Sequence, residues 1–303
     1  MGTLIGHVIP GIGFFIIGLW HLINNIKLHS LNPKSYISLP FFPTSKSKYL
    51  ELYFMMGCSS FYILLELVFG QIGHHLFDSD GAIRSNHLRN FEHAFITLWM
   101  LVYSVFAKIL DKHGRPKSKY GLTMTLAVVM FCQEFLLYHL HSTDHMGLEG
   151  HYHWFLQIVI FVSIVTTILS IGYRNSFLIS FVRSFSILFQ GVWDIVMGIM
   201  LWTPSVIPKD CFMIKEEYFR VRCHTKEALD RAKALTTLEF SWYLVVFVVL
   251  TMFLYMYMTK LYPEKAGFEP FVKYDREHEK IEDNVDTKKK SVKSDLLDTL
   301  IEA

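Results

Sequence analysis

Histidines and acidic residues occur together in the most apolar parts of this sequence, which contains 15 histidines in all. An ionisable side chain within an apolar segment is costly and is therefore a functional candidate by default. Neutral imidazole binds Zn, Cu, Fe and Ni, and carboxylates can complete the ligand shell. We therefore predict a site for a divalent metal such as Zn or Cu, with the candidate ligands His7, Glu66, His93, Glu134, His139 and His153.

Two other interpretations of the same residues stay open. Histidine titrates near physiological pH, so the cluster could take up or relay protons. The third interpretation is structural, with imidazole and carboxyl groups joining the helices by hydrogen bonds. The sequence contains no HExxH or CxxC motif that would favour the metal over the other two.

A membrane enzyme is the alternative function. In such a hydrolase, three protein ligands hold a metal ion whose fourth position activates water. His93, His139 and His153 would be the ligands, Glu134 or Glu66 would be the general base, and a lipid-like molecule would be the substrate. A helical scaffold or a transporter is a further alternative, although the early and late helices show no convincing internal repeat of the kind common in transporters.

The elements that must position these residues are membrane-spanning helices. Hydrophobic residues make up 52% and charged residues 18% of the sequence, and the apolar residues are gathered in long blocks. Each block has about twenty residues, the number needed to cross a hydrocarbon core about 30 Å thick. The predicted surroundings are therefore the lipid bilayer, in the secretory pathway, the endomembranes or the plasma membrane. The pattern predicts an all-α bundle of seven transmembrane helices, at Leu4–Ile26, Leu50–Phe69, Leu88–Leu110, Tyr120–Leu140, His153–Gly172, Phe177–Trp202 and Phe240–Leu261.

The distribution of Lys and Arg predicts the orientation of this bundle, because cytosolic connections are enriched in both. Residues 27–49 contain four lysines and residues 108–119 contain five basic residues, whereas residues 141–152 contain none. The N-terminus is therefore predicted to lie outside the cytosol or in a lumen, and the C-terminus in the cytosol. Most of the histidines then fall in the outer half, so the predicted site is a polar pocket in that half.

The chain divides into a membrane domain and a tail. We predict that residues 1–262 form the seven-helix domain. Residues 263–303 are charged and poor in large apolar residues, which predicts a disordered cytosolic tail. The net charge is only +2, and the basic residues are spread over short connections rather than forming one face. Nucleic acid is therefore not a predicted partner, and the sequence indicates no particular protein partner.

Residues 203–239 form a long connection that the predicted orientation places outside the cytosol. The connection contains Cys211 and Cys223. Because disulfides form in that compartment, we predict a bond between them, and a cytosolic location would leave both thiols reduced. Residues Thr225–Leu235 have the pattern of a short amphipathic helix, with Thr225 as its N-cap.

Small and polar residues mark the first and sixth predicted helices. Gln190 and Asp194 place polar groups within the sixth. Glycines permit close approach of transmembrane helices, and they occur here at Gly6, Gly11, Gly13, Gly18, Gly191 and Gly198.

Several short motifs occur in a characteristic order along residues 1–262. They are Gly6-His7-Val8-Ile9-Pro10-Gly11 followed by Gly18-Leu19-Trp20, then Asn90-Phe91-Glu92-His93-Ala94, Gln133-Glu134 with Leu136-Leu137-Tyr138-His139, and Arg183 with Gln190-Gly191 and Trp193. In these motifs the chain resembles the transmembrane protein 45 family, also catalogued as domain of unknown function family 716. The resemblance implies a seven-helix membrane protein of the secretory pathway without a settled activity. The resemblance also implies that the family's polar intramembrane residues correspond in this chain to His7, Glu66, His93, Glu134, His139, His153 and Gln190.

Overall fold

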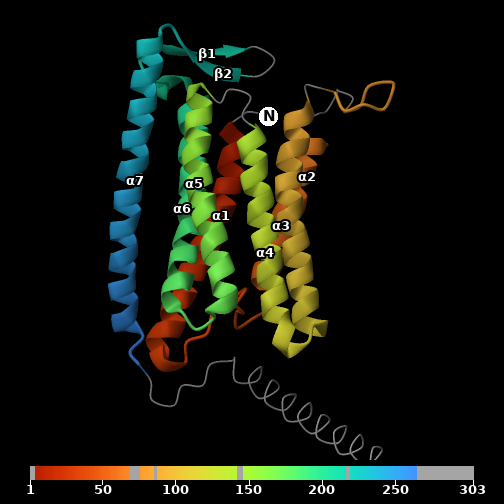
Figure 1. The fold of residues 1–303 in the computed structure, drawn as a ribbon, viewed down its shortest axis with the longest axis vertical. Helices are drawn as coiled ribbons and strands as arrows, with labels where there is room; N and C mark the ends of the chain where they lie inside the picture. The colour runs from red at the N-terminus through yellow and green to blue at the C-terminus, as the bar shows by residue number, and fades with distance from the viewer. Residues whose placement is uncertain (1–3, 69–75, 85–86, 142–145, 216–218, 265–303) are drawn as a thin grey trace, which may run out of the picture.

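The protein is almost entirely helical, and its helices run side by side (Figure 1). The computed structural model describes residues 4–68, 76–84, 87–141, 146–215 and 219–264. The predicted tail falls outside this range from residue 265 onward. The main helices are α1 (Leu4–Leu31), α2 (Leu50–Leu67), α3 (Leu88–His113), α4 (Pro116–His141), α5 (Leu148–Gly172), α6 (Phe177–Trp202) and α7 (Lys226–Leu261), and two single 3-10 turns are at Pro33–Ser35 and Pro204–Val206.

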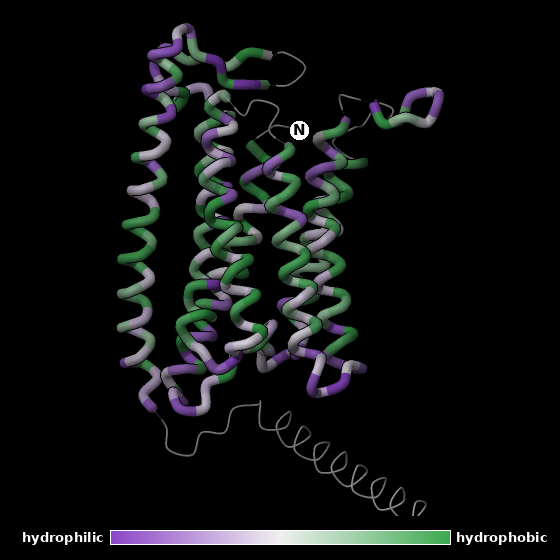
Figure 2. Tube along the Cα trace, in the orientation of Figure 1, coloured by the Kyte–Doolittle hydropathy of each residue, from purple (hydrophilic) through white to green (hydrophobic). Residues whose placement is uncertain are grey.

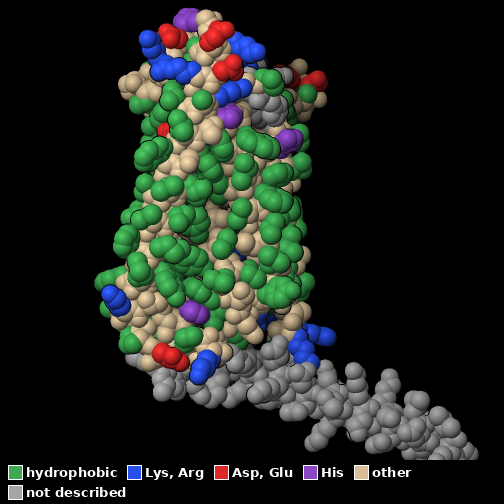
Figure 3. All heavy atoms as spheres, turned by 60° about the vertical axis from the view of Figure 1, so that its left-hand side comes forward, with side chains coloured by type: hydrophobic (Ala, Val, Ile, Leu, Met, Phe, Trp, Pro, Cys, Tyr) green, Lys and Arg blue, Asp and Glu red, His purple; other side chains and the backbone are tan. Residues whose placement is uncertain are grey.

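Seven of the described helices are long and apolar enough to cross a membrane, which confirms the predicted fold class. Hydrophobic residues follow the length of the helices, while hydrophilic residues collect at the helix ends (Figure 2). On the face that includes α7, apolar side chains cover the middle of the molecule and most charged side chains lie at its two ends (Figure 3). This distribution is that of a protein whose middle contacts lipid. The predicted orientation of the termini stays a prediction.

Helix α6 is the most buried of the seven, and α1 packs along it. Helices α2 and α3 pack together, and α4 joins this pair to α5. Helix α7 lies at the edge of the bundle (Figure 1), where only five of its residues are buried. The most extensive helix contact in the bundle is therefore the one between α1 and α6.

Glycine makes the close crossing of α1 and α6 possible. A Cβ atom added at Gly18 would collide with the backbone of Leu188, and one added at Gly191 would collide with the backbone of Phe15. Gly13 differs, because a Cβ atom there would meet nothing within 4 Å. Gly18 therefore permits the close packing of α1 against α6, whereas Gly13 leaves open space beside α1.

One expectation for the last helix was wrong. Thr225–Leu235 and Phe240–Leu261 were expected to be separate helices, but α7 is continuous from Lys226 to Leu261. The residues between the two segments include no Pro or Gly that would end a helix. Thr225 is the N-cap, because its hydroxyl accepts a hydrogen bond from the backbone N–H of Ala228 at 3.1 Å.

A short antiparallel hairpin, β1 (Cys211–Lys215) and β2 (Phe219–Cys223), covers one end of the bundle, which we call the hairpin end (Figure 1). The sequence predicts only a long connection here, without strands. Cys211 and Cys223 face each other across the two strands and form a disulfide bond. The bond ties the two outer ends of the hairpin together just before α7 begins.

Replacing both Cys211 and Cys223 by serine is expected to loosen the hairpin while the helices stay folded. A disulfide across a loop of this size stabilises the folded state by about 2–4 kcal/mol, chiefly by restricting the unfolded chain. Limited proteolysis should therefore cut the variant first within residues 211–223. The matched control is the double serine variant of Cys58 and Cys132, which form no disulfide in the described chain. Equal cleavage of both variants would contradict a stabilising role for the bond.

Candidate functional site

A cavity of about 280 Å³ lies between α1, α2, α3 and α4, in the half of the bundle nearer the hairpin. We call it the lateral cavity. Its wall is mainly apolar, with side chains such as Ile9, Phe14 and Ile96. Its polar lining residues are His7, Ser59, Tyr62, His93, Thr97, Glu134 and Tyr138. Three of the six predicted site residues therefore border one cavity.

The polar side chains next to this cavity come from four helices. His7 of α1 is buried and stacks on Trp202, with ring centroids 4.4 Å apart. The centroid of its ring is 6.1 Å from that of His93 on α3 and 5.9 Å from that of His153 on α5. Glu66 of α2 lies beside His93, with Oε1 3.2 Å from Nδ1. The structure thus brings four of the predicted residues together, one from each helix.

The hydrogen bonds of Glu66 show how the start of α3 is fixed against α2. The side-chain amide of Asn90 donates to Glu66 Oε2 at 2.6 Å, while Oε1 faces His93. Asn90 and His93 are three residues apart and so lie on one face of α3. This spacing is what places both side chains on the same carboxylate.

Glu134 reaches the lateral cavity from α4. Its Oε1 accepts a hydrogen bond of 2.6 Å from the side-chain amide of Gln190 on α6. Among the described residues, no Lys or Arg lines the cavity. A fully buried carboxyl group, Asp194, lies on the same helix as Gln190, at the crossing with α1 opposite Gly11. Neither oxygen of Asp194 has a hydrogen-bond partner among the described residues.

His139 does not join this group. Its side chain is exposed, and its Nδ1 lies 3.1 Å from Oε1 of Gln157 on α5. The preceding residue, Tyr138, is buried and lines the lateral cavity instead. Successive helical residues point about 100° apart, so only one of these two neighbours can face inward.

The metal prediction finds no support in this geometry. Among the described residues, no three or more His, Cys, Asp and Glu side chains are placed so that they could hold one metal ion. The structure does not bring His139 to His93 and His153, as the hydrolase alternative requires. A resident Zn or Cu ion stays a prediction.

These features define an α-helical, multipass membrane protein with buried polar side chains in its interior. Residues 120–256 match the model of a family described as a family of unknown function, DUF716. The match covers most of α4, α5, α6 and most of α7, and it leaves His7, Glu66 and His93 outside. It supports this part of the resemblance seen in the sequence, whereas the transmembrane protein 45 family stays a prediction.

Proposed function

We propose that the protein binds a lipid-like amphiphile in the lateral cavity. The observation that carries this proposal is the cavity itself, which has a mainly apolar wall and also includes the polar side chains of His7, His93 and Glu134. Its volume of about 280 Å³ is near the lower limit for small-molecule pockets, roughly 300 Å³. It would therefore enclose a head group with the first part of an apolar chain, and the rest of the chain would extend into the bilayer.

Access from the bilayer is supported by the residues on the rim of the cavity. Ile12 and Ile16 of α1 line it while they are 46% and 43% exposed. Phe61 of α2 lines it and is 54% exposed. In a protein whose middle contacts lipid, such side chains face acyl chains, so an amphiphile could move sideways from the membrane into the cavity.

The polar lining indicates which head group fits. The hydroxyl of Ser59 is buried and has no hydrogen-bond partner among the described residues. Glu134 offers a carboxyl group, and its Oε2 receives no hydrogen bond within the described chain. Because no Lys or Arg among the described side chains lines the cavity, a phosphate or carboxylate head would meet no permanently charged cation there. A hydroxyl head would instead donate a hydrogen bond to Glu134 and accept one from Ser59, whereas an ammonium head would donate to both.

Replacing Gly13 by leucine is expected to block the cavity while the protein stays folded. Gly13 lines the lateral cavity, and a Cβ atom added there would meet nothing within 4 Å. A leucine would fill that space, and exchanging glycine for a better helix former contributes about 0.8–1 kcal/mol in a helix interior. Labelling by a photoreactive long-chain alcohol in nanodiscs should fall by about tenfold or more, while the melting temperature stays the same or rises.

The matched control is Gly57→Leu. Gly57 lies on α2, also has open space beside it, and is exposed without lining the cavity. Crosslinks in the wild-type protein should map to α1 and α2 near Cys58, and Gly57→Leu should retain them. Equal labelling of the two variants, or crosslinks spread evenly over the lipid-facing surface, would contradict the proposal.

Other functions for this pocket have weaker support. The proton interpretation stays a prediction for His7, His93 and Glu134. The hydrolase alternative requires three assembled ligands, and the described residues contain no such set. We therefore favour binding of an amphiphile over a reaction on it.

A further inference from the structure

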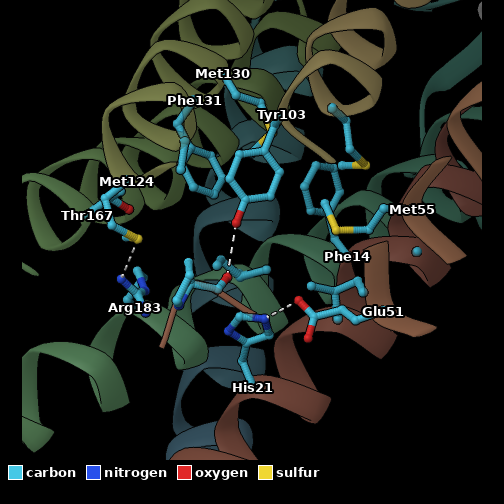
Figure 4. Close-up of a pocket in the computed structure, with 16 residues that line it drawn as sticks. Phe14, His21, Glu51, Met55, Tyr103, Met124, Met130, Phe131, Thr167 and Arg183 are labelled. Carbon is cyan, nitrogen blue, oxygen red and sulfur yellow. Dashed lines mark hydrogen bonds and ion pairs between the residues drawn. The ribbon is translucent and has the colours of Figure 1, made fainter. Parts of the chain in front are cut away.

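A second cavity adjoins the lateral cavity and extends into the half of the bundle away from the hairpin. The two cavities share the lining residues Gly13, Phe14, Met100 and Met130. The volume of the second cavity is about 60 Å³, and we call it the Arg183 cavity. Figure 4 shows Arg183, His21 and Glu51 on one side of it, with Tyr103, Phe131 and Met130 on the other. Roughly 10–15 Å³ is enough for one water molecule, so the cavity has room for a small ion with a water beside it.

Arg183 is buried here with only neutral partners. It is 3% exposed, its Nη1 donates to Ser170 Oγ at 2.8 Å, and its Nη2 donates to Ser38 Oγ at 3.2 Å. Nη1 also lies 3.8 Å from the sulfur of Met124. Among the described residues, no carboxylate oxygen lies within 4.0 Å of the guanidinium group. A guanidinium group keeps its charge in proteins, so a fixed positive charge is buried without a direct counter-charge.

Glu51 lines the same cavity, but both of its carboxylate oxygens are hydrogen-bonded to other groups. Its Oε2 accepts hydrogen bonds from Trp20 Nε1 at 3.0 Å and from the backbone N–H of Phe42 at 2.8 Å. Its Oε1 lies 2.7 Å from His21 Nε2. Both oxygens are therefore engaged away from Arg183.

The neighbouring hydroxyl groups do not supply a negative charge either. Burial raises the pKa of Tyr36 to about 12, and its hydroxyl donates to Asn25 Oδ1 at 2.6 Å. Tyr103 donates to the carbonyl of Pro40 at 3.0 Å, and Thr167 donates to the carbonyl of Ser163 at 2.6 Å. All three groups are neutral at physiological pH. A buried cation that is desolvated and unpaired is unfavourable, so an ion from solution would supply what the chain does not.

We propose that the Arg183 cavity binds a small monovalent anion of the halide class, such as chloride, against the guanidinium group of Arg183. The volume suits a monatomic ion and is too small for the head group of a lipid. The remaining lining, with Met55, Met130 and Phe131, favours a weakly hydrated anion over a strongly hydrated one. The pairing would be a charge-assisted interaction, which is stronger than one between neutral groups.

The test uses purified full-length protein in nanodiscs of uncharged lipid, at constant ionic strength, with gluconate replaced stepwise by chloride. A ligand that binds only the folded state raises the melting temperature in a saturable way. We expect that rise for the wild-type protein, and we expect Arg183→Gln to weaken apparent chloride affinity by about tenfold or more. Arg84→Gln is the matched control, because Arg84 is a surface arginine that pairs with Asp78. It should respond to chloride as the wild-type protein does.

A direct measurement keeps the test decisive if Arg183→Gln does not fold. Crystals of the wild-type protein soaked in bromide should show an anomalous peak beside the guanidinium group of Arg183. No chloride response in the wild-type protein, an unchanged response in Arg183→Gln, or no anomalous peak in the cavity would each overturn the proposal. These outcomes do not test the amphiphile, because Arg183 does not line the lateral cavity.

Discussion

Gly191→Ala is expected to leave little stably folded protein. A Cβ atom at this position of α6 would collide with the backbone nitrogen of Phe15 and the carbonyl oxygen of Gly11 on α1. Backbone atoms of a helix cannot move aside singly, so the two helices would have to separate along their whole contact. Overpacking of a core costs about 1–3 kcal/mol and occasionally more, and this position belongs at the upper end of that range. Fluorescence-detected size-exclusion chromatography and the melting temperature would measure the loss.

Gly18→Ala on α1 should behave in the same way, because its Cβ atom would collide with the backbone of Leu188 on α6. The control is Gly13→Ala on α1, where a Cβ atom meets nothing within 4 Å. That substitution should be neutral or should stabilise the helix by up to about 1 kcal/mol. Equal stability of the Gly13 and Gly18 variants would show that the close crossing of α1 and α6 is not the source of the effect.

The difference between these glycines also shows what the sequence could and could not predict. The helices themselves were predictable, because long apolar blocks are a property of composition. Gly11 and Gly18 are seven residues apart and share a face of α1, while Gly13 points elsewhere. Which face meets α6 depends on how the helices pack, and one sequence does not contain that information. The β hairpin was missed for a related reason, because each of its five-residue strands is defined by pairing with the other.

The sequence predicted which kinds of residue form the candidate site, but not which individual residues lie together. His7, Glu66, His93 and His153 were predicted and lie together. His139 was predicted with them and faces away, since helix rotation brings Tyr138 inward. The Arg183 cavity had a weaker signal. In the sequence, Arg183 stands out only as part of a family motif. Nothing in the sequence predicts that it lines a cavity with Glu51, which stands 132 positions earlier in the chain.

Glu51→Gln is expected to be among the most destabilising substitutions in the chain outside the α1–α6 crossing. Glu51 lies in the first turn of α2 and is only 6% exposed. It holds three groups: the indole of Trp20, the imidazole of His21 and the backbone N–H of Phe42. A glutamine keeps the shape but turns one acceptor into a donor that faces other donors. Leaving a buried donor without its acceptor costs about 1–3 kcal/mol, and more where the acceptor is charged. A fall in the melting temperature would measure this loss.

Two further substitutions separate the charge of Glu51 from its hydrogen bonds. Trp20→Phe removes one of the three donors and leaves the carboxylate, so it should cost only about 0.5–1.5 kcal/mol. Glu227→Gln alters an exposed carboxylate in the first turn of α7 and should stay within about 1 kcal/mol of the wild-type protein. If Glu51→Gln fell in the range of Glu227→Gln, the buried carboxylate would not be what joins the end of α1, the segment at Phe42 and the start of α2. Glu51 could then not be regarded as fully engaged by its three donors, and it would have to be reconsidered as a counter-charge for Arg183.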